Sequence, residues 1–179
     1  MGILTCPFGL SFSGRRITLS TVGLVPEIAR MGREMPINLA VSLHAADDET
    51  RSAIMPINRK YPLRELMRTL RAYPLPPRQR ITFEYVLLSG VNDRPEDAHR
   101  LARLIRGIRA KVNLIPMNEH PGSIHRRPPP GRVEAFREIL QSYHLTVTLR
   151  ATRGDDIAAA CGQLQGAPPS SPSVRVAER

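Results

Sequence analysis

Residues 153–164, Arg-Gly-Asp-Asp-Ile-Ala-Ala-Ala-Cys-Gly-Gln-Leu, place a single thiol after a charged turn. An alternating apolar run (Leu145, Val147, Leu149) precedes them, so Cys161 follows a predicted strand and a polar loop. An α/β enzyme often presents a reactive group in this way, at the carboxyl end of its sheet. A lone cysteine among alanines is also typical of a small buried side chain, and the residue pattern alone favours that interpretation.

Polar side chains lie at the ends of three other predicted strands. Ser20 is at the end of the first strand, Ser42 and His44 at the end of the second, and Asn118 just after the fourth. Taken singly, each residue has a structural explanation. Ser20 can cap the start of a helix and Ser42 can be a small core residue. His44 can be a capped surface histidine, and Asn118 a turn former. Because parallel strands gather their carboxyl ends at one edge, together they indicate a site for a small polar cofactor.

Three carboxylates have less definite roles. Glu84 lies inside an apolar strand, where a charge needs a partner. We expect an ion pair with an arginine of a neighbouring strand, and a catalytic base is the second interpretation. Asp155 and Asp156 are adjacent, so their side chains would point to opposite sides of an extended chain. No His or Cys cluster has ligand spacing, and no glycine-rich phosphate loop is present, so no metal site is predicted.

Strands and helices alternate along the chain with short joints, which predicts a parallel sheet. The second strand is apolar nearly throughout, as expected of a parallel strand covered on both faces. Asp47 or Asp48 is expected to cap one helix, and Asp93 with Glu96 another. Five strands suit an open doubly wound sheet or part of a (β/α) barrel. The predicted strands are residues 16–22, 37–43, 81–88, 112–115 and 145–150.

The composition is basic, with 26 Lys and Arg against 16 Asp and Glu in 179 residues, a net charge of +10. Such a surface attracts polyanions such as RNA, although an arginine-biased composition explains the charge equally well. No apolar run approaches the roughly 20 residues that span a bilayer, and the N-terminus does not resemble a signal peptide. Two cysteines far apart in sequence form no disulfide framework. We therefore expect a cytoplasmic protein without a membrane partner.

Seven segments, in order along the chain, together resemble the radical-SAM adenine-C2 methyltransferases of ribosomal RNA, some of which also modify transfer RNA. The match extends over residues 3–164. The resemblance implies an α/β fold, a partial (β/α) barrel of the radical-SAM type, formed by residues 1–164. Residues 165–179, rich in Pro, Ser and Ala, are expected to form a disordered tail. The segments are residues 17–26, 39–45, 55–61, 84–88, 90–93, 113–118 and 153–164.

The resemblance also implies roles for individual residues. Cys161 matches the cysteine that accepts a methyl group from one S-adenosylmethionine. A second S-adenosylmethionine is cleaved reductively at a [4Fe–4S] cluster, and its radical activates the methylated cysteine for addition to adenine. Ribosomal RNA, transfer RNA and an electron donor for the cluster are the partners implied. The positions that match S-adenosylmethionine contacts are Ser20, Ser42, Leu43, His44 and Asn118.

The chain also departs from the family pattern. The Cys-x-x-x-Cys-x-x-Cys motif that holds the cluster is absent, because Cys6 and Cys161 are the only cysteines. The Gly-Glu-Pro motif, the second catalytic cysteine and the N-terminal accessory domain are also absent, and all would precede residue 1. We therefore expect the C-terminal part of such an enzyme, missing the N-terminal strands of its barrel and inactive alone.

Three alternatives stay open at this point. The chain could be a non-catalytic RNA-binding remnant. It could be a half-enzyme that acts when a separate chain supplies the cluster. It could also belong to the antibiotic-resistance relatives, which methylate another carbon of the same adenine, although its motifs resemble the C2 group more closely.

Overall fold

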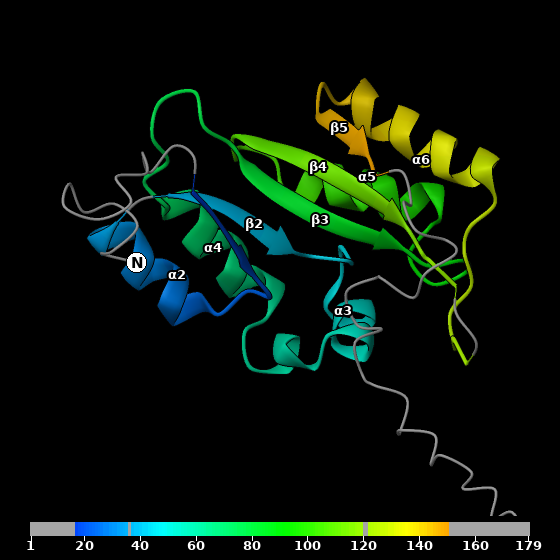
Figure 1. Cartoon of the computed structure of the whole chain (residues 1–179), viewed down its shortest axis with the longest axis horizontal. Helices are drawn as coiled ribbons and strands as arrows, with labels where there is room; N and C mark the ends of the chain where they lie inside the picture. The colour runs from blue at the N-terminus through cyan, green and yellow to red at the C-terminus, as the bar shows by residue number, and fades with distance from the viewer. Residues whose placement is uncertain (1–16, 36, 120–121, 151–179) are drawn as a thin grey trace, which may run out of the picture.

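The computed structural model describes residues 17–35, 37–119 and 122–150 (Figure 1). Within these ranges the strands form one five-stranded parallel sheet with the spatial order β1-β2-β3-β4-β5. The spatial order is the chain order, whereas a doubly wound sheet reverses its order at a switch point. The strands are therefore arranged as in part of a (β/α) barrel, as the resemblance implied. Their bounds are β1 Thr18–Thr21, β2 Asn38–Ser42, β3 Ile81–Leu87, β4 Ala110–Pro116 and β5 Thr146–Leu149.

Helices connect successive strands and confirm the alternating pattern. α2 has Pro26 in its first turn, where a proline loses no helical hydrogen bond. The short 3-10 helix η2 was not predicted from the sequence. In the described part of the chain, no helix is long and apolar enough to cross a membrane. The bounds are α2 Val25–Glu34, α3 Asp48–Ile54, η2 Pro56–Arg59, α4 Leu63–Ala72, α5 Pro95–Leu104 and α6 Pro130–Ser142.

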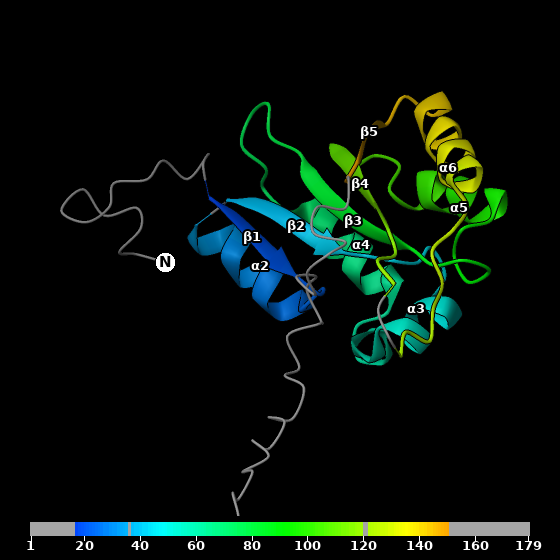
Figure 2. The same ribbon diagram turned by 45° about the vertical axis from the view of Figure 1, so that its right-hand side comes forward.

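The hydrophobic core lies on one face of the sheet, beneath α2, α4, α5 and α6 (Figure 2). Alternate residues of β3 (Ile81, Phe83, Tyr85 and Leu87) are fully buried there, while those between them are half-buried on the opposite face. The described helices pack on one face of β2, and Ala40, which lies on the opposite face, is buried as well. The apolar run of β2 arises because its core-facing residues are large and a small one, Ala40, lies between them.

The helix caps differ in part from the predictions. Asp47 caps α3 as expected, since its Oδ1 accepts the N–H of Thr50 at 2.7 Å. Asp93 does not cap α5. The N-cap is Arg94, whose N–H donates to the Asp97 carboxylate at 3.1 Å. Asp93 instead accepts the N–H of Gly90 at 2.9 Å, so it closes the turn that precedes the helix.

Candidate functional site

The structure places the predicted cofactor contacts at or near the carboxyl edge of the sheet. Ser20 is the third residue of β1, Ser42 ends β2, and Asn118 follows β4 by two residues. The side chains of these three residues form no hydrogen bond to other described residues, so they are available to a ligand. Leu43 differs, because its side chain is fully buried in the core. Cys161 lies outside the described residues.

His44 is held in an unusual backbone conformation directly after β2. Its φ of 57° lies in the left-handed region, which few residues other than glycine adopt. Its Nδ1 accepts the N–H of Val86 at 3.1 Å, so the imidazole extends the β2–β3 hydrogen bonding beyond the last strand residue. An Nδ1 that accepts has no proton, so the neutral ring has its proton on Nε2. The fold thus fixes both the position and the tautomer of this histidine.

The environment of His44 also keeps it neutral. Burial lowers its pKa to about 4, the positive charge of Arg51 acts in the same direction, and the carbonyl of Glu84 acts against both. At neutral pH the ring is therefore a hydrogen-bond donor through Nε2 and has no charge. Such a group can recognise a polar ligand atom without adding positive charge to the edge.

Arg51 links the carboxyl ends of β1 and β2 through its guanidinium group. Its side chain is fully buried, and its Nη2 donates to the carbonyl of Val22 at 2.9 Å and to that of Ser42 at 3.2 Å. Its Nε donates to the carbonyl of Leu43 at 3.1 Å. Gly23, with a φ of 101°, leaves room for this guanidinium, because a Cβ there would lie 3.3 Å from Nη2. One cation therefore fixes both strand ends that carry predicted site residues.

A second layer of hydrogen bonds holds Arg51 in place. Its Nη1 donates to Oδ1 of Asn58 at 2.8 Å, and the amide nitrogen of Asn58 donates to Asp48 Oδ1 and to Ser52 Oγ, both at 2.9 Å. Asp48 also accepts the N–H of Leu63 at 2.8 Å, at the start of α4. α3 and η2, which lie beyond the carboxyl end of β2 (Figure 1), therefore position the guanidinium. A buried cation needs such partners, since its desolvation is otherwise unfavourable.

Asn92 performs the same task between β2 and β3. It is almost fully buried, and its amide nitrogen donates to the carbonyls of His44 and Val86, both at 2.7 Å. Its Oδ1 accepts the N–H of Leu88 at 2.7 Å. The hydroxyl of Tyr85 donates to the backbone carbonyl of Asn92 at 2.9 Å. The left-handed conformation of His44 is therefore fixed at its carbonyl as well as at its ring.

A row of polar side chains crosses the face of the sheet that the described helices leave uncovered. In register, Ser42 pairs with Glu84, Glu84 with Asn113, and Asn113 with Thr148. Asn113 Nδ2 donates to Glu84 Oε2 at 2.8 Å, and Thr148 Oγ1 donates to Asn113 Oδ1 at 3.0 Å. The predicted pairing of Glu84 with an arginine is therefore wrong among the described residues. A neutral amide satisfies the carboxylate because Asn113 lies directly beside it on the next strand.

Four polar residues form the hydrogen-bonded frame of the carboxyl edge, and none of them was predicted from the sequence: Arg51, Asn58, Asn92 and Asn113. The contacts that join separate strands are to residues far away in sequence, as with Arg51 and Val22 or Asn92 and His44, so no local pattern reveals them. A usable signal existed for three of them, because Asn58, Asn92 and Asn113 fall within segments that carry the family resemblance. Among the described residues, no group of three or more His, Cys, Asp or Glu could hold a metal ion.

The chain is similar in sequence to dual-specificity RNA methyltransferases named RlmN. The protein of Syntrophobacter fumaroxidans is 59% identical over 162 residues, which cover 90% of this chain and 47% of the relative. That of Anaeromyxobacter dehalogenans is 57% identical over 164 residues, which cover 92% of this chain and 44% of the relative. No family model matches the chain.

The chain is also similar to solved structures. A radical SAM methyltransferase from Sphaerobacter thermophilus superimposes with a TM-score of 0.83 at 49% identity, over 90% of this chain and 48% of that one. A domain of pyruvate-formate lyase-activating enzyme from Bacteroides vulgatus shares the fold, with a TM-score of 0.59 at 16% identity. The chain thus spans about half the length of the curated relatives that it matches.

Proposed function

We propose a function from the premise that this chain belongs to the radical-SAM RNA methyltransferases and forms their C-terminal portion. In this proposal it supplies one half of an active site that methylates carbon 2 of an adenine in large-subunit ribosomal RNA. Transfer RNA is a second substrate, and the reaction takes place in the cytoplasm. Residues 1–164 are the part of the barrel core concerned, and residues 165–179 a tail. The observation that carries the proposal is the carboxyl edge, where a buried frame holds His44 beside polar side chains free for a ligand.

S-adenosylmethionine is the cofactor that the carboxyl edge suits. The hydroxyls of Ser20 and Ser42 and the amide of Asn118 can donate to and accept from its polar groups, and His44 can donate from Nε2. The buried guanidinium of Arg51 adds a positive potential that favours the carboxylate of an amino acid. When bound, this cofactor supplies the methyl group and, with the iron–sulfur cluster, the radical.

The [4Fe–4S] cluster does not fit this chain alone. The family motif uses three thiolates close in sequence, whereas the chain has Cys6 and Cys161, far apart. The cluster ligands, and the electron donor that reduces the cluster, would therefore come from another part of the enzyme. We accordingly propose that the chain by itself does not complete the reaction.

Cys161 is the proposed methyl acceptor. A thiolate is a good nucleophile toward an activated methyl group, whereas an aromatic C–H carbon is not, so the protein itself must carry the one-carbon unit. The segment between Leu149 and Cys161 spans at most about 40 Å when extended. Since β5 ends at the carboxyl edge, this length lets the thiol return to the cofactor side chains.

The test joins this chain to the N-terminal half of the Syntrophobacter fumaroxidans relative and supplies both with a large-subunit RNA fragment under anaerobic, reducing conditions. Digestion and mass spectrometry then identify the methylated nucleoside. We expect 2-methyladenosine, lost in Cys161→Ala and retained in the matched control Cys6→Ala. A product that survives Cys161→Ala, or a methyl group on another adenine carbon, would overturn the proposal.

A further inference from the structure

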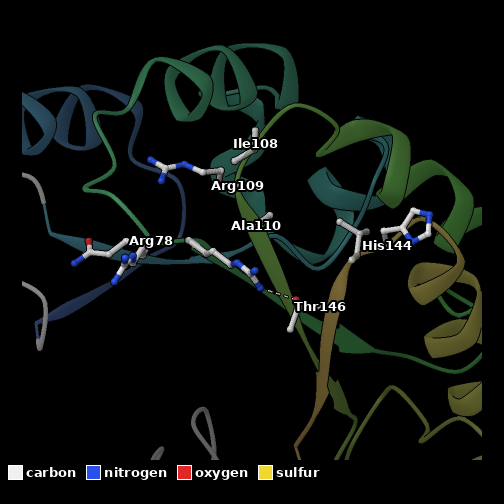
Figure 3. A pocket seen from close by; sticks show the side chains of 9 residues that line it. Arg78, Ile108, Arg109, Ala110, His144 and Thr146 are labelled. Carbon is white, nitrogen blue, oxygen red and sulfur yellow. Dashed lines mark hydrogen bonds between the residues drawn. The ribbon is translucent and has the colours of Figure 1, made fainter.

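A hollow lies at the amino-terminal edge of the sheet, opposite the carboxyl edge (Figure 3). Its lining comes from three places: the residues before β3, the start of β4, and the turn between α6 and β5. A seven-residue strand such as β3 separates the two edges by about 23 Å. The hollow is therefore distinct from the candidate cofactor site and needs its own explanation.

The charge of the hollow is positive and uncompensated. Arg78, Arg80 and Arg109 line it, no acidic residue does, and within the described ranges none of the three forms an ion pair. The ring of His144 points away from Arg78 and Arg109, so the positive charge of the hollow comes from the arginines (Figure 3). Three guanidinium groups around one hollow attract an anion strongly, because each can bind two oxygens of a phosphate at once.

Two of these arginines are held in place by neutral partners. Arg109 Nη2 donates to the carbonyl of Leu75 at 2.7 Å and its Nη1 to that of Pro76 at 3.3 Å. Arg80 Nη1 donates to Thr146 Oγ1 at 2.6 Å, from the residue before β3 to the first residue of β5. These hydrogen bonds orient the guanidinium groups without neutralising their charge. Ligand binding therefore loses less side-chain conformational entropy than it would with freely rotating arginines.

The loop before β3 shows two further irregularities in the same hollow. Arg78 has a φ of 66°, in the left-handed region, where a bulky residue is strained. The amide nitrogen and oxygen of the adjacent Gln79 are buried without a hydrogen-bond partner among the described residues. A native buried amide is nearly always paired, so an unpaired one at the wall of a hollow indicates a missing partner.

We infer that this hollow, lined by Arg78, Arg80 and Arg109, binds backbone phosphates of the RNA substrate at a distance from the methylated adenine. The inference rests on the proposed function in that RNA is the polyanion. No Phe, Tyr or Trp lines the hollow, so it lacks the large aromatic side chains on which successive bases stack. Binding here is expected to be insensitive to sequence and sensitive to salt.

The test measures binding of a fluorescein-labelled RNA stem-loop to the full chain by anisotropy at several salt concentrations. The pocket variant combines Arg78→Ala, Arg80→Ala and Arg109→Ala. The control combines Arg33→Ala, Arg64→Ala and Arg68→Ala, three exposed arginines of α2 and α4 that lose the same charge.

We expect the pocket variant to weaken binding by about tenfold or more and to lower the salt slope by about 2 to 3, since each phosphate contact contributes about 0.7 in a single strand and about 0.9 in a duplex. The control should change affinity by less than about threefold. Equal weakening in both variants would overturn the inference, because general charge would then explain the binding. A variant in which all three pocket arginines become lysine should keep the salt slope and fold normally, so misfolding of the alanine variant cannot imitate the result.

A second arm separates RNA from a small anion. Pyrophosphate is added at constant ionic strength, and we expect RNA to stay bound. Displacement of RNA from the wild type at micromolar pyrophosphate would reassign the hollow to a free phosphate compound and overturn the RNA inference. Because binding is measured without S-adenosylmethionine or a cluster, failure of the methylation test would leave this result unaffected.

Discussion

The arginines at the two edges of the sheet differ in burial and in hydrogen bonding. At the carboxyl edge, Arg51 is fully buried and its donors are bonded to carbonyls and to an amide. At the amino-terminal edge, Arg80 and Arg109 are exposed, and their charge has no acidic partner among the described residues. A buried charge that is fully hydrogen-bonded stabilises a geometry, whereas an exposed, unpaired charge attracts a ligand. The first edge therefore has the fixed geometry that the proposed cofactor site requires, and the second has the charge that the proposed RNA contact requires.

The largest expected effect comes from removing the buried cation. Arg51→Met should lower the free energy of unfolding by about 3–5 kcal/mol, because the carbonyls of Val22, Ser42 and Leu43 lose their donors inside the protein. Urea unfolding followed by circular dichroism measures the change. The matched control is Arg68→Met on the exposed surface of α4, which should cost less than about 0.5 kcal/mol. Equal costs would show that Arg51 does not hold the carboxyl edge.

The pH dependence of stability should report the buried His44. Its pKa is about 4 in the folded protein and about 6.5 in the unfolded chain, so the unfolded state binds a proton more readily between these values. The contribution is complete above pH 6.5 and is lost as pH falls toward 4, a total of about 3 kcal/mol. His44→Asn, a residue that tolerates positive φ, should remove this part of the slope. A histidine that titrates near pH 6.5 in an NMR titration would contradict the assignment.

A somewhat smaller loss is expected at Asn92. Asn92→Ala removes two donated hydrogen bonds and one accepted one, which should destabilise the fold by about 2 kcal/mol. The amide of Leu88 should also exchange with deuterium faster. Asn118→Ala is the comparison, since its side chain forms no hydrogen bond to a described residue, and its cost should be within about 0.5 kcal/mol. If Asn118→Ala destabilises the fold as much as Asn92→Ala, the distinction between residues that support the fold and residues that contact the cofactor would be wrong.

The smallest effect is expected on the half-buried face of the sheet. Asn113→Ala removes the donor to Glu84 and the acceptor for Thr148, at a cost of about 1 kcal/mol. Thr148→Val removes one of these bonds on an exposed side chain and should cost less than about 0.5 kcal/mol. Thermal unfolding of both variants ranks them, and a larger loss for Thr148→Val would contradict the proposed row.

The strands and helices could be predicted because their signals are local. The apolar period of Leu63, Leu66, Met67 and Leu70 marks α4, and the run from Ile81 marks β3. The choice between a barrel and a doubly wound sheet could not be made from these periods, because both folds alternate strands and helices. The family resemblance indicated the barrel type, and the strand order bears it out.

The positions of the proposed contact residues could be predicted from the sequence, whereas the residues that hold them in place could not. Ser42, His44 and Asn118 stand at strand ends, which a sequence reveals. The local sequence does not distinguish Arg51 from the exposed arginines of other helices, and only its contacts with the ends of β1 and β2 show that it is buried. A tertiary contact of this kind has no period and no spacing, so pattern analysis does not detect it.

The most direct test of the central claim is the fate of the thiol. The chain joined to the N-terminal half of a relative is incubated anaerobically with methyl-labelled S-adenosylmethionine, and the peptides containing Cys6 and Cys161 are analysed by mass spectrometry. We predict a labelled methyl group on Cys161 and none on Cys6. An unlabelled Cys161 in a joined protein that still methylates RNA would show that another group carries the methyl, and would contradict the account of this chain.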